Sequence, residues 1–297
     1  MVSGLFEGKT TGAPLTILIQ NSNQHSSDYE ELRYTPRPSH GDYPGFVAAR
    51  GCLDFRGGGH FSGRLTAPLV AAGAVARQIL AERGITVAAH IAIINGKYDD
   101  TFTYADDIDR AQSALAALAD STFPVLNAEA GEEMRQLILD ARENGDSVGG
   151  AVECAVFGLP AGLGAPDFGK NAEGVFSSHL FAIPAVKAVE FGAGTAFSYM
   201  LGSEGNDPLL SRDGAVVTAT NYAGGINGGI TNGMPLVFTA TFRPTPSISL
   251  PQQTVDLRTG EETELVIKGR HDPCIVPRAV PVVEAAAALA ACELLGI

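Results

Sequence analysis

Glycine falls in short clusters along this chain, and the clusters divide it into segments of different pattern. The chain has 35 glycines in 297 residues, about 12%, against a usual value of about 7%. Between the clusters, predicted strands and helices follow one another without a regular alternation. Such an order favours an α+β fold with antiparallel strand pairing over a doubly wound parallel sheet. No repeat and no linker divides the chain, so we expect a single domain over residues 1–297.

Hydrophobic periodicity predicts the individual elements. β-Branched and apolar runs predict strands at 13–20, 85–94, 147–157, 237–242 and 264–267. Apolar residues at helical spacing predict helices at 66–83, 106–119, 132–144, 174–191 and 282–295. Pro184 must kink or restart the fourth of these helices. Residues 24–63, which are polar and rich in Pro, Gly and Arg, are predicted to be loop.

Composition excludes several classes of protein. The net charge of -13 argues against a nucleic-acid surface, which needs a basic stripe. There is no run of 18 or more apolar residues and no basic, apolar leader, so we expect a cytoplasmic protein without a membrane span. The four cysteines are far apart and form no C-x-x-C pair. They therefore favour reduced thiols over a zinc site or a disulfide framework, and no metal is expected.

Two segments of this acidic chain are locally cationic. Residues 37–64 hold Arg37, Arg50, Arg56 and Arg64 against Asp42 and Asp54. Residues 268–278 hold Lys268, Arg270 and Arg278 against Asp272 alone. These two segments are where we expect an anionic ligand to bind.

Two motifs resemble catalytic patterns but lie in the wrong context. Residues 145–149 fit the G-x-S-x-G of a hydrolase, which needs a strand before the serine and a helix after it. Here a predicted helix precedes Ser147 and a predicted strand follows, so a turn is favoured over a nucleophile. Residues 164–171 nearly fit a phosphate loop, but Asn171 replaces the magnesium-binding hydroxyl, and we expect a plain loop there.

The glycine-rich segment 54–64 leads into the predicted helix at Thr66. Three successive glycines let backbone N–H groups approach a ligand closely, and the positive end of the helix dipole would lie beside Ser62 and Arg64. This segment is either a phosphate cradle or a mobile surface loop. His40, flanked by Arg37 and Asp42 in a nearby loop, would on its own be a solvated histidine.

Two later segments also leave two interpretations open. Residues 223–233 are rich in glycine and carry no charge, which suits either a backbone surface against a flat ligand or a series of tight turns. Asp272 stands between cationic neighbours. Its carboxylate can abstract a proton, or it forms a structural ion pair.

Taken together and in this order, these segments resemble the chorismate synthase family. The residues that carry the resemblance are Arg37–Asp42, Phe55–Gly59, Gly145–Gly150, Pro160–Gly164, Ala182–Lys187, Ala223–Ile226, Arg243–Ile248 and Gly269–Pro273. The likeness runs from about Leu5 to Leu295. It implies a β-α-β sandwich, in which helices pack between antiparallel sheets.

The resemblance implies an enzyme of the shikimate pathway, which leads to the aromatic amino acids. The family is a lyase that eliminates phosphate from 5-enolpyruvylshikimate 3-phosphate in a trans-1,4 sense, giving chorismate. It uses reduced FMN (FMNH₂) without net redox change, it is associated with NADP through flavin reduction, and it is a homotetramer. The same cofactor, substrate and assembly are therefore expected here.

The resemblance also assigns residues. His40 corresponds to the histidine that protonates the reduced flavin, and Asp272 to the carboxylate that works with the flavin in removing the ring proton. The residues implied to bind FMN are His60, Phe61, Ser62, Pro184, Ala185, Gly228, Arg243, Pro244, Thr245, Pro246, Ser247 and Arg270.

The sequence departs from the family pattern in two places. After the three glycines the family usually has Arg-Ser-Ser-Ala-Arg-Glu, whereas this chain has His-Phe-Ser-Gly-Arg-Leu at residues 60–65. The family also opens with roughly another fifth of its length, which holds a further catalytic histidine and substrate-binding arginines, and the corresponding stretch is not in this sequence. Two expectations follow: an active synthase, or a flavin-binding homologue that is inactive because that segment is absent.

Overall fold

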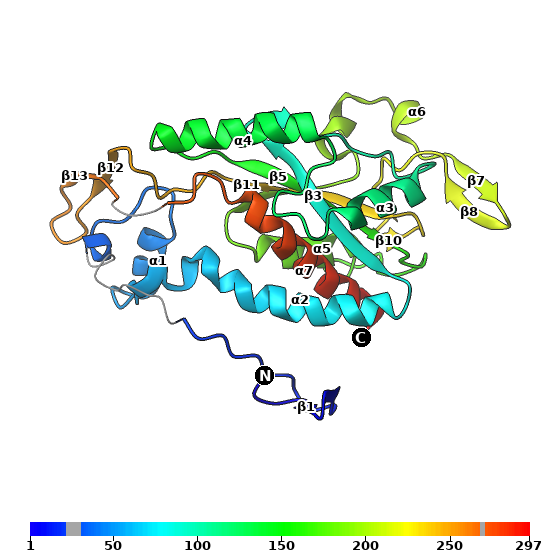
Figure 1. Ribbon diagram of the computed structural model, residues 1–297, viewed down its shortest axis with the longest axis horizontal. Helices are drawn as coiled ribbons and strands as arrows, with labels where there is room; N and C mark the ends of the chain where they lie inside the picture. Colours follow the sequence, from blue (N-terminus) through cyan, green and yellow to red (C-terminus); the bar gives the residue numbers. More distant parts are fainter. Residues whose placement is uncertain (22–30, 268–270) are drawn as a thin grey trace.

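The centre of the structure is a five-stranded sheet in the order β4-β3-β5-β11-β6, in which every neighbouring pair is antiparallel (Figure 1). This computed structural model describes residues 1–21, 31–267 and 271–297. The strands of the sheet are β3 (Thr86–Ile94), β4 (Lys97–Tyr98), β5 (Gly150–Phe157), β6 (Val186–Phe191) and β11 (Leu236–Phe242). The predicted strands at 85–94, 147–157 and 237–242 all lie in it.

Helices cover both faces of this sheet. On one face lie α2 (Thr66–Ala81), α5 (Ala172–Phe181) and α7 (Val276–Leu295), and their apolar side chains share one core with β3, β5 and β11. On the other face α3 (Ile108–Ala117) buries Ala111 and Leu115 against Ala88, Ala155 and Val237. The helix α4 (Ala128–Glu143) contacts β3 and β4. The fold is therefore mixed α+β with antiparallel sheets, as predicted.

The alanine-rich helix α7 allows α2 to approach it very closely. A Cβ atom added to Gly73 of α2 would lie 2.4 Å from Cα of Ala285, which real Cβ atoms do not do. Glycine in a helix costs about 1 kcal/mol relative to alanine. Here that cost is offset by the close packing of two helices that cover the sheet.

The remaining sheets are small. In the part of the chain that the structure describes there are four of them, each with two antiparallel strands. They are β1 (Leu5–Phe6) with β2 (Lys9–Thr10), β7 (Leu209–Arg212) with β8 (Ala215–Thr218), β9 (Ile226–Asn227) with β10 (Ile230–Thr231), and β12 (Gln252–Val255) with β13 (Glu262–Leu265). The β7–β8 hairpin projects from the body of the molecule beyond α6 (Gly202–Gly205) (Figure 1).

Two predicted elements are wrong. The run 13–20 is not a strand: within it only Thr16 forms a bridge, to Ser3, so its β-branched residues have no neighbouring strand to pair with. The predicted helix 174–191 is a helix only in its first half. It ends at Phe181, and Val186–Phe191 form the edge strand β6, which pairs with β11. Pro184 prevents the helix from continuing, because proline has no backbone N–H.

Other boundaries differ by a few residues. Within 24–63, which was predicted to be loop, the described part contains the short helix α1 (Asp42–Ala48) and the 3₁₀ helices η2 (Glu31–Arg33) and η3 (Arg56–Phe61). The helix α4 begins at Ala128, earlier than predicted, because the Asn127 side chain accepts hydrogen bonds from the N–H groups of Glu129 and Ala130. Pro277 suits the first turn of α7, which begins before the predicted residue 282.

Three further findings concern the predictions about a membrane span, the cysteines and the G-x-S-x-G segment. No helix of the described residues is long and apolar enough to cross a membrane. The four cysteines are unpaired, and all but Cys52 are buried. The G-x-S-x-G segment follows α4 and precedes β5, and Ser147 donates a hydrogen bond to the carbonyl oxygen of Thr245 at 2.7 Å. It is a turn, as predicted.

Candidate active site

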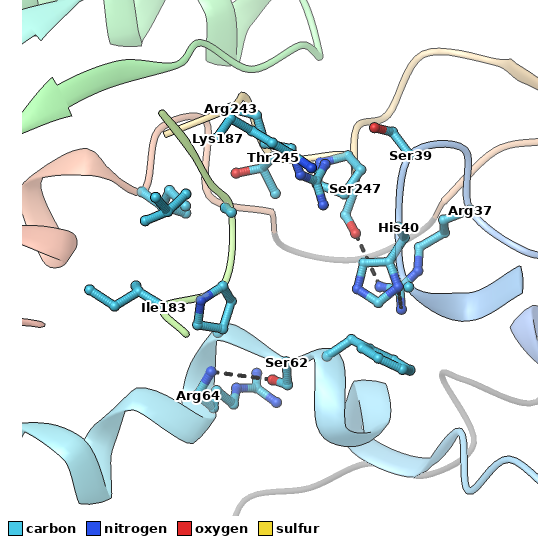
Figure 2. Close-up of a pocket in the computed structure, with 18 of the residues that line it drawn as sticks. Arg37, Ser39, His40, Ser62, Arg64, Ile183, Lys187, Arg243, Thr245 and Ser247 are labelled. Atoms are coloured by element: carbon cyan, nitrogen blue, oxygen red, sulfur yellow. Dashed lines mark hydrogen bonds between the residues drawn. The ribbon is translucent and has the colours of Figure 1, made fainter. Parts of the chain in front are cut away.

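A cavity of about 610 Å³ lies where segments far apart in the sequence meet (Figure 2). Its walls come from the loop that leads into α1, from η3 and the 3₁₀ helix η4 (Gly63–Leu65) before α2, from the turn between α5 and β6, and from the segment after β11. The volume is typical of a site for a small organic ligand. The lining residues are Arg37, Ser39, His40, Gly41, residues 60–64, residues 181–187, Arg243, Thr245, Pro246, Ser247 and Ile275.

The wall of this cavity is cationic although the chain is acidic. Among the described residues that line it there are four arginines or lysines and two histidines, and no Asp or Glu. The cationic residues are Arg37, Arg64, Lys187 and Arg243, and the histidines are His40 and His60. Positive groups gathered in a hollow without counter-charges on its surface favour an anionic ligand, and arginine suits phosphate and carboxylate in particular.

One side of the cavity is formed by the paired strands β6 and β11. Lys187 follows Val186 and Arg243 follows Phe242. Val186 and Phe242 are opposite each other in this antiparallel pair, so the two cations lie on either side of it, and both line the cavity (Figure 2). Burial lowers the pKa of Arg243. The Oγ1 of Thr245 is buried and has no hydrogen-bond partner among the described residues. Leaving a buried hydroxyl unpaired is unfavourable, and a ligand oxygen in the cavity would supply the partner.

The opposite side is organised around Asp42. Its Oδ2 accepts hydrogen bonds from Nε of Arg37 at 2.7 Å and from the main-chain N–H of Arg37 at 3.1 Å, and its Oδ1 accepts from Nη2 of Arg37 at 2.9 Å. Burial alone would raise the pKa of Asp42, but its hydrogen bonds with Arg37 and His40 outweigh burial and hold that pKa well below its usual range. The carboxylate lies 2.7 Å from Nδ1 of His40. His40 is thus held at the cavity by an ionised partner.

Phe61 packs beside His40, with the two rings edge to face and their centroids 6.3 Å apart. The ring also lies over two glycines of the α1 region. A Cβ atom on either Gly41 or Gly45 would come within 2.4 Å of a ring carbon of Phe61. The departure from the family pattern at residue 61 is therefore accommodated by the absence of side chains at these two positions.

The glycine-rich segment leads to the N-terminus of α2 at the edge of the cavity. The Oγ of Ser62 accepts a hydrogen bond from the main-chain N–H of Arg64 at 3.3 Å, and α2 follows at Thr66. Ser62 and Arg64 line the cavity, together with His60. The same three residues also border a second hollow of about 490 Å³. This arrangement supports the interpretation of 54–64 as a ligand-facing segment.

Ten of the residues predicted to bind FMN or to act in catalysis line this cavity. They are His40, His60, Phe61, Ser62, Pro184, Ala185, Arg243, Thr245, Pro246 and Ser247. Pro244 belongs to the same segment but is exposed and is not a lining residue. Gly228 lies in the turn between β9 and β10, which is at the other end of the molecule from α1 (Figure 1). Arg270 is outside the described residues.

Asp272 does not line the cavity. Its carboxylate accepts a hydrogen bond from Nη1 of Arg278 at 2.6 Å, and its side chain is 40% exposed. Ile275, three residues further along, is part of the cavity wall. The structure therefore shows Asp272 in an ion pair beside the site, which is one of the two interpretations left open by the sequence.

The residues 223–233 form tight turns. Gly224 and Gly225 have φ values of 64° and 80°, and a Cβ atom on Gly225 would lie 2.5 Å from the carbonyl oxygen of Pro235. They lie outside the cavity wall. Among the described residues, no group of three or more His, Cys, Asp or Glu is placed to hold a metal ion.

Sequence reasoning assigned no role to Lys187, although this residue stands in one of the family motifs. The pattern that identifies it is the pairing of β6 with β11, and the wrong prediction of a helix over 174–191 concealed that pairing. Arg37 and Arg64 belong to the cationic segment that the sequence did single out, and both reach the cavity.

Comparison with known proteins decides the family. The family model for chorismate synthase matches residues 1–295. The chain belongs to the chorismate synthase family. The chorismate synthase of Thermococcus gammatolerans is 50% identical over 286 residues, which cover 96% of this chain and 77% of that protein. The chorismate synthase of Aeropyrum pernix is 45% identical over 300 residues, which cover 99% of this chain and 76% of that protein.

A solved structure agrees with this assignment. A crystal structure of chorismate synthase superposes with a TM-score of 0.69 and 27% sequence identity, covering 84% of this chain and 69% of that one. The resemblance inferred from the motifs is thus confirmed, as is the α+β fold of the chorismate synthase type. The chain is a member of an enzyme family, and the cavity is the candidate for its active site.

Proposed function

We propose that this chorismate synthase family member eliminates phosphate from 5-enolpyruvylshikimate 3-phosphate and forms chorismate, with its active site in the cavity described above. The observation that carries the proposal is the cationic wall: none of the described residues that line it is an Asp or Glu, although the chain has a net charge of -13. The substrate is a phosphate ester that also carries carboxylates. A cavity with Arg37, Arg64, Lys187 and Arg243 suits such a polyanion.

The residues present also fit reduced FMN. The cofactor has a phosphate and a flat ring system, and the wall offers both cationic and apolar groups. Lys187, Arg243 and the unpaired hydroxyl of Thr245 would hold an anionic group, while Ile183 and Pro184 present apolar surface to a ring. When bound, reduced FMN supplies the electron-rich ring that this elimination requires without net redox change. We favour an active enzyme over an inactive flavin-binding homologue, because relatives of similar sequence are named chorismate synthase.

The elimination breaks a carbon–oxygen bond to phosphate and a carbon–hydrogen bond of the ring. Negative charge grows on the departing phosphate, and fixed cations aimed at that charge stabilise it without reorganising. The four cationic residues of the wall would provide this stabilisation, and they would also orient the substrate's carboxylates. Phe61 and Ile275 contribute apolar surface that limits the access of water.

Two residues are candidates for the proton transfers. His40 lines the cavity and is oriented through Nδ1, so Nε2 is the atom that would hold or release a proton there. For removal of the ring proton we retain Asp272 as the candidate base, since it lies three residues from Ile275 of the wall. It would act from the edge of the site, where Arg278 holds its carboxylate.

The proposal is tested by an anaerobic assay with dithionite-reduced FMN and 5-enolpyruvylshikimate 3-phosphate. Chorismate, followed by its ultraviolet absorbance, and inorganic phosphate are expected in equal amounts. The wild type is compared with His40→Ala. This variant should turn over about 10²-fold more slowly, or slower still, if His40 transfers a proton. Flavin binding without any product would favour the inactive homologue instead.

A further inference from the structure

Asp42 lies behind His40 and is not itself a lining residue of the cavity. We propose that Asp42, held in place by Arg37, is a positioning residue that keeps the proton of the neutral His40 ring on Nδ1, so that Nε2 is free to exchange a proton inside the cavity. The catalytic consequence rests on the proposed function. The effect on the histidine ring does not, and it is measured separately.

Both oxygens of Asp42 accept hydrogen bonds from Arg37, with Nη2 of Arg37 2.9 Å from Oδ1, but only Oδ1 also contacts His40. Oδ2 accepts both the main-chain N–H and the Nε–H of Arg37, and Oδ1 lies 2.7 Å from Nδ1 of His40. An ionised carboxylate can only accept hydrogen bonds, so Nδ1 must be the donor. A neutral imidazole carries one proton, and Nε2 is then left with its lone pair. No partner of Nε2 is found among the described residues.

Arg37 determines what would happen without the carboxylate. It is only 8% exposed, and its Nη2 lies 3.1 Å from Nδ1 of His40, within hydrogen-bond distance. While Asp42 is ionised, Nδ1 carries a proton and cannot accept from this group. If the carboxylate were removed, Nδ1 could accept from Arg37, which would move the ring proton to Nε2. Asp42 therefore opposes a tautomer that its own salt-bridge partner favours.

The surroundings of His40 hold the arrangement in one geometry. Nη1 of Arg37 is 3.2 Å from Oγ of Ser247, which ties the pair to the segment after β11. The edge-to-face contact with Phe61 restricts the imidazole from the side of η3. The other charged or titratable groups of the wall are His60, Arg64, Lys187 and Arg243. Arg64, Lys187 and Arg243 have no acceptor atom in their charged groups, and no hydrogen bond joins His60 to His40 among the described residues.

The decisive variant is Asp42→Asn, which keeps the size of the side chain. Its amide oxygen is expected to remain with the main-chain N–H and Nε–H of Arg37 that now bind Oδ2. The amide N–H₂ then takes the place of Oδ1 and faces both Nη2 of Arg37 and Nδ1 of His40. Nδ1 must then accept, and the proton moves to Nε2. The ¹⁵N shifts of the His40 ring, recorded without ligands at alkaline pH and assigned by their loss in His40→Ala, should show the protonated nitrogen change from Nδ1 in the wild type to Nε2 in the variant.

Kinetics give the second measurement. If Nε2 must exchange a proton, kcat of Asp42→Asn should fall by about 10²-fold or more. KM should not rise, because the variant leaves Arg37 positive and removes a negative charge beside an anion site. A merely structural defect would raise KM and leave the tautomer unchanged. The matched control is Asp256→Asn. It also removes a carboxylate that is paired with an arginine, Arg258, but this pair lines no described cavity. In this variant the tautomer of His40 and kcat should be those of the wild type.

Loss of one partner of a buried ion pair is strongly destabilising, so the folding of Asp42→Asn must be checked. If this variant does not fold, the double variant Arg37→Gln/Asp42→Asn replaces it, because it leaves no unpaired charge. In that protein the His40 ring should no longer be confined to the Nδ1–H form. A ring that stays protonated on Nδ1 in whichever variant folds would overturn the proposal. If the wild type forms no chorismate but the tautomer switches as expected, the proposed function fails while the positioning by Asp42 stands.

Discussion

At the scale of single residues, the fit between Gly41 and Phe61 shapes the site next to His40. Gly41→Ala would place a methyl group 2.4 Å from the ring of Phe61, so the ring must move. We expect the affinity for FMN to fall about 10-fold, in line with the usual cost of overpacking. Titration of flavin fluorescence measures it. In a Phe61→Ser background the same Gly41→Ala change should have little effect, and an equal loss in both backgrounds would contradict this explanation.

Asp272 provides a second test at this scale. Asp272→Asn should abolish turnover while leaving the affinity for FMN nearly intact, because a base is lost but the cationic wall is unchanged. Arg278→Ala, which removes the ion-pair partner of Asp272 and leaves the carboxylate in place, is the matched comparison. Steady-state kinetics and flavin titration measure both variants. Normal turnover by Asp272→Asn would remove this residue from the mechanism.

The sequence predicted individual site residues well where a motif is local. His40 and Ser247 stand in motifs whose order along the chain is specific, and both reach the cavity. It could not predict that Asp42 and Arg37 form the support of His40, because that depends on hydrogen-bond geometry within a loop. Nor could it place Gly228, which follows the family motif Ala223–Ile226 and lies in a turn that does not line the cavity.

At the scale of elements, the contact between α2 and α7 depends on Gly73. An alanine is intrinsically favoured in a helix by about 1 kcal/mol, but at this position its Cβ would meet backbone atoms of Ala285. We therefore expect Gly73→Ala to destabilise the protein by about 1 to 3 kcal/mol. Urea unfolding measures this. The control is Gly63→Ala, since a Cβ atom there would meet nothing within 4 Å, and equal stability of the Gly73 variant and the wild type would contradict the expected clash.

Elements with a long periodic pattern were predicted correctly, and the exceptions have physical reasons. The helix at 66–81 and the strand at 86–94 each have a regular pattern of apolar residues, and side chains of that pattern are buried in the core. The segment 174–191 has apolar residues at positions that suit both a helix and a strand, and only the pairing of β6 with β11 decides between them. The run 13–20 shows the opposite case, because strand propensity without a partner does not make a strand.

At the scale of the whole molecule, a buried charged network links β3, β5 and the segment before α4. His90 is fully buried, with Nδ1 2.9 Å from Asp99 and Nε2 3.2 Å from Glu153. Asp99 also accepts the main-chain N–H groups of Leu126 and Asn127. Burial would lower the pKa of His90, but the hydrogen bonds to both carboxylates outweigh burial and raise it to about 9.

This raised pKa predicts how stability depends on pH. The unfolded chain binds the His90 proton with the ordinary value of about 6.5, so the protonated network stabilises the fold fully below about pH 6.5. That contribution should be lost as pH rises toward 9. Urea unfolding of the wild type and of His90→Gln between pH 6 and 10 measures it, and the difference in stability between the two should shrink as pH rises. A difference that does not change with pH would contradict this assignment.

The assembly stays a prediction. The projecting β7–β8 hairpin exposes Leu209 and Val216, at 73% and 69%, as large apolar side chains. An exposed apolar surface of this kind, which a partner subunit would cover, is consistent with the homotetramer expected from the family. Light scattering on the purified protein should give about four times 30.8 kDa. A mass near 30.8 kDa at micromolar concentration would contradict it.

The overall α+β class could be predicted from sequence because it depends on the order of elements, whereas the cavity could not. Its wall joins Arg37, Arg64, Lys187 and Arg243, which are brought together by the pairing of β6 with β11 and by the packing of the loop before α1. No local pattern contains that information. The cationic segment 37–64 could be identified from the sequence, but only the fold brings Lys187 and Arg243 beside Arg37 and Arg64.

The most direct test is a crystal structure of the protein with FMN and 5-enolpyruvylshikimate 3-phosphate bound. We expect both ligands in the cavity of about 610 Å³, with phosphate oxygens within hydrogen-bond distance of the cationic wall and His40 facing the ligands. Ligands that bind elsewhere, such as beside Gly228 or only in the neighbouring hollow before α2, with this cavity left to solvent, would contradict the assignment of the active site.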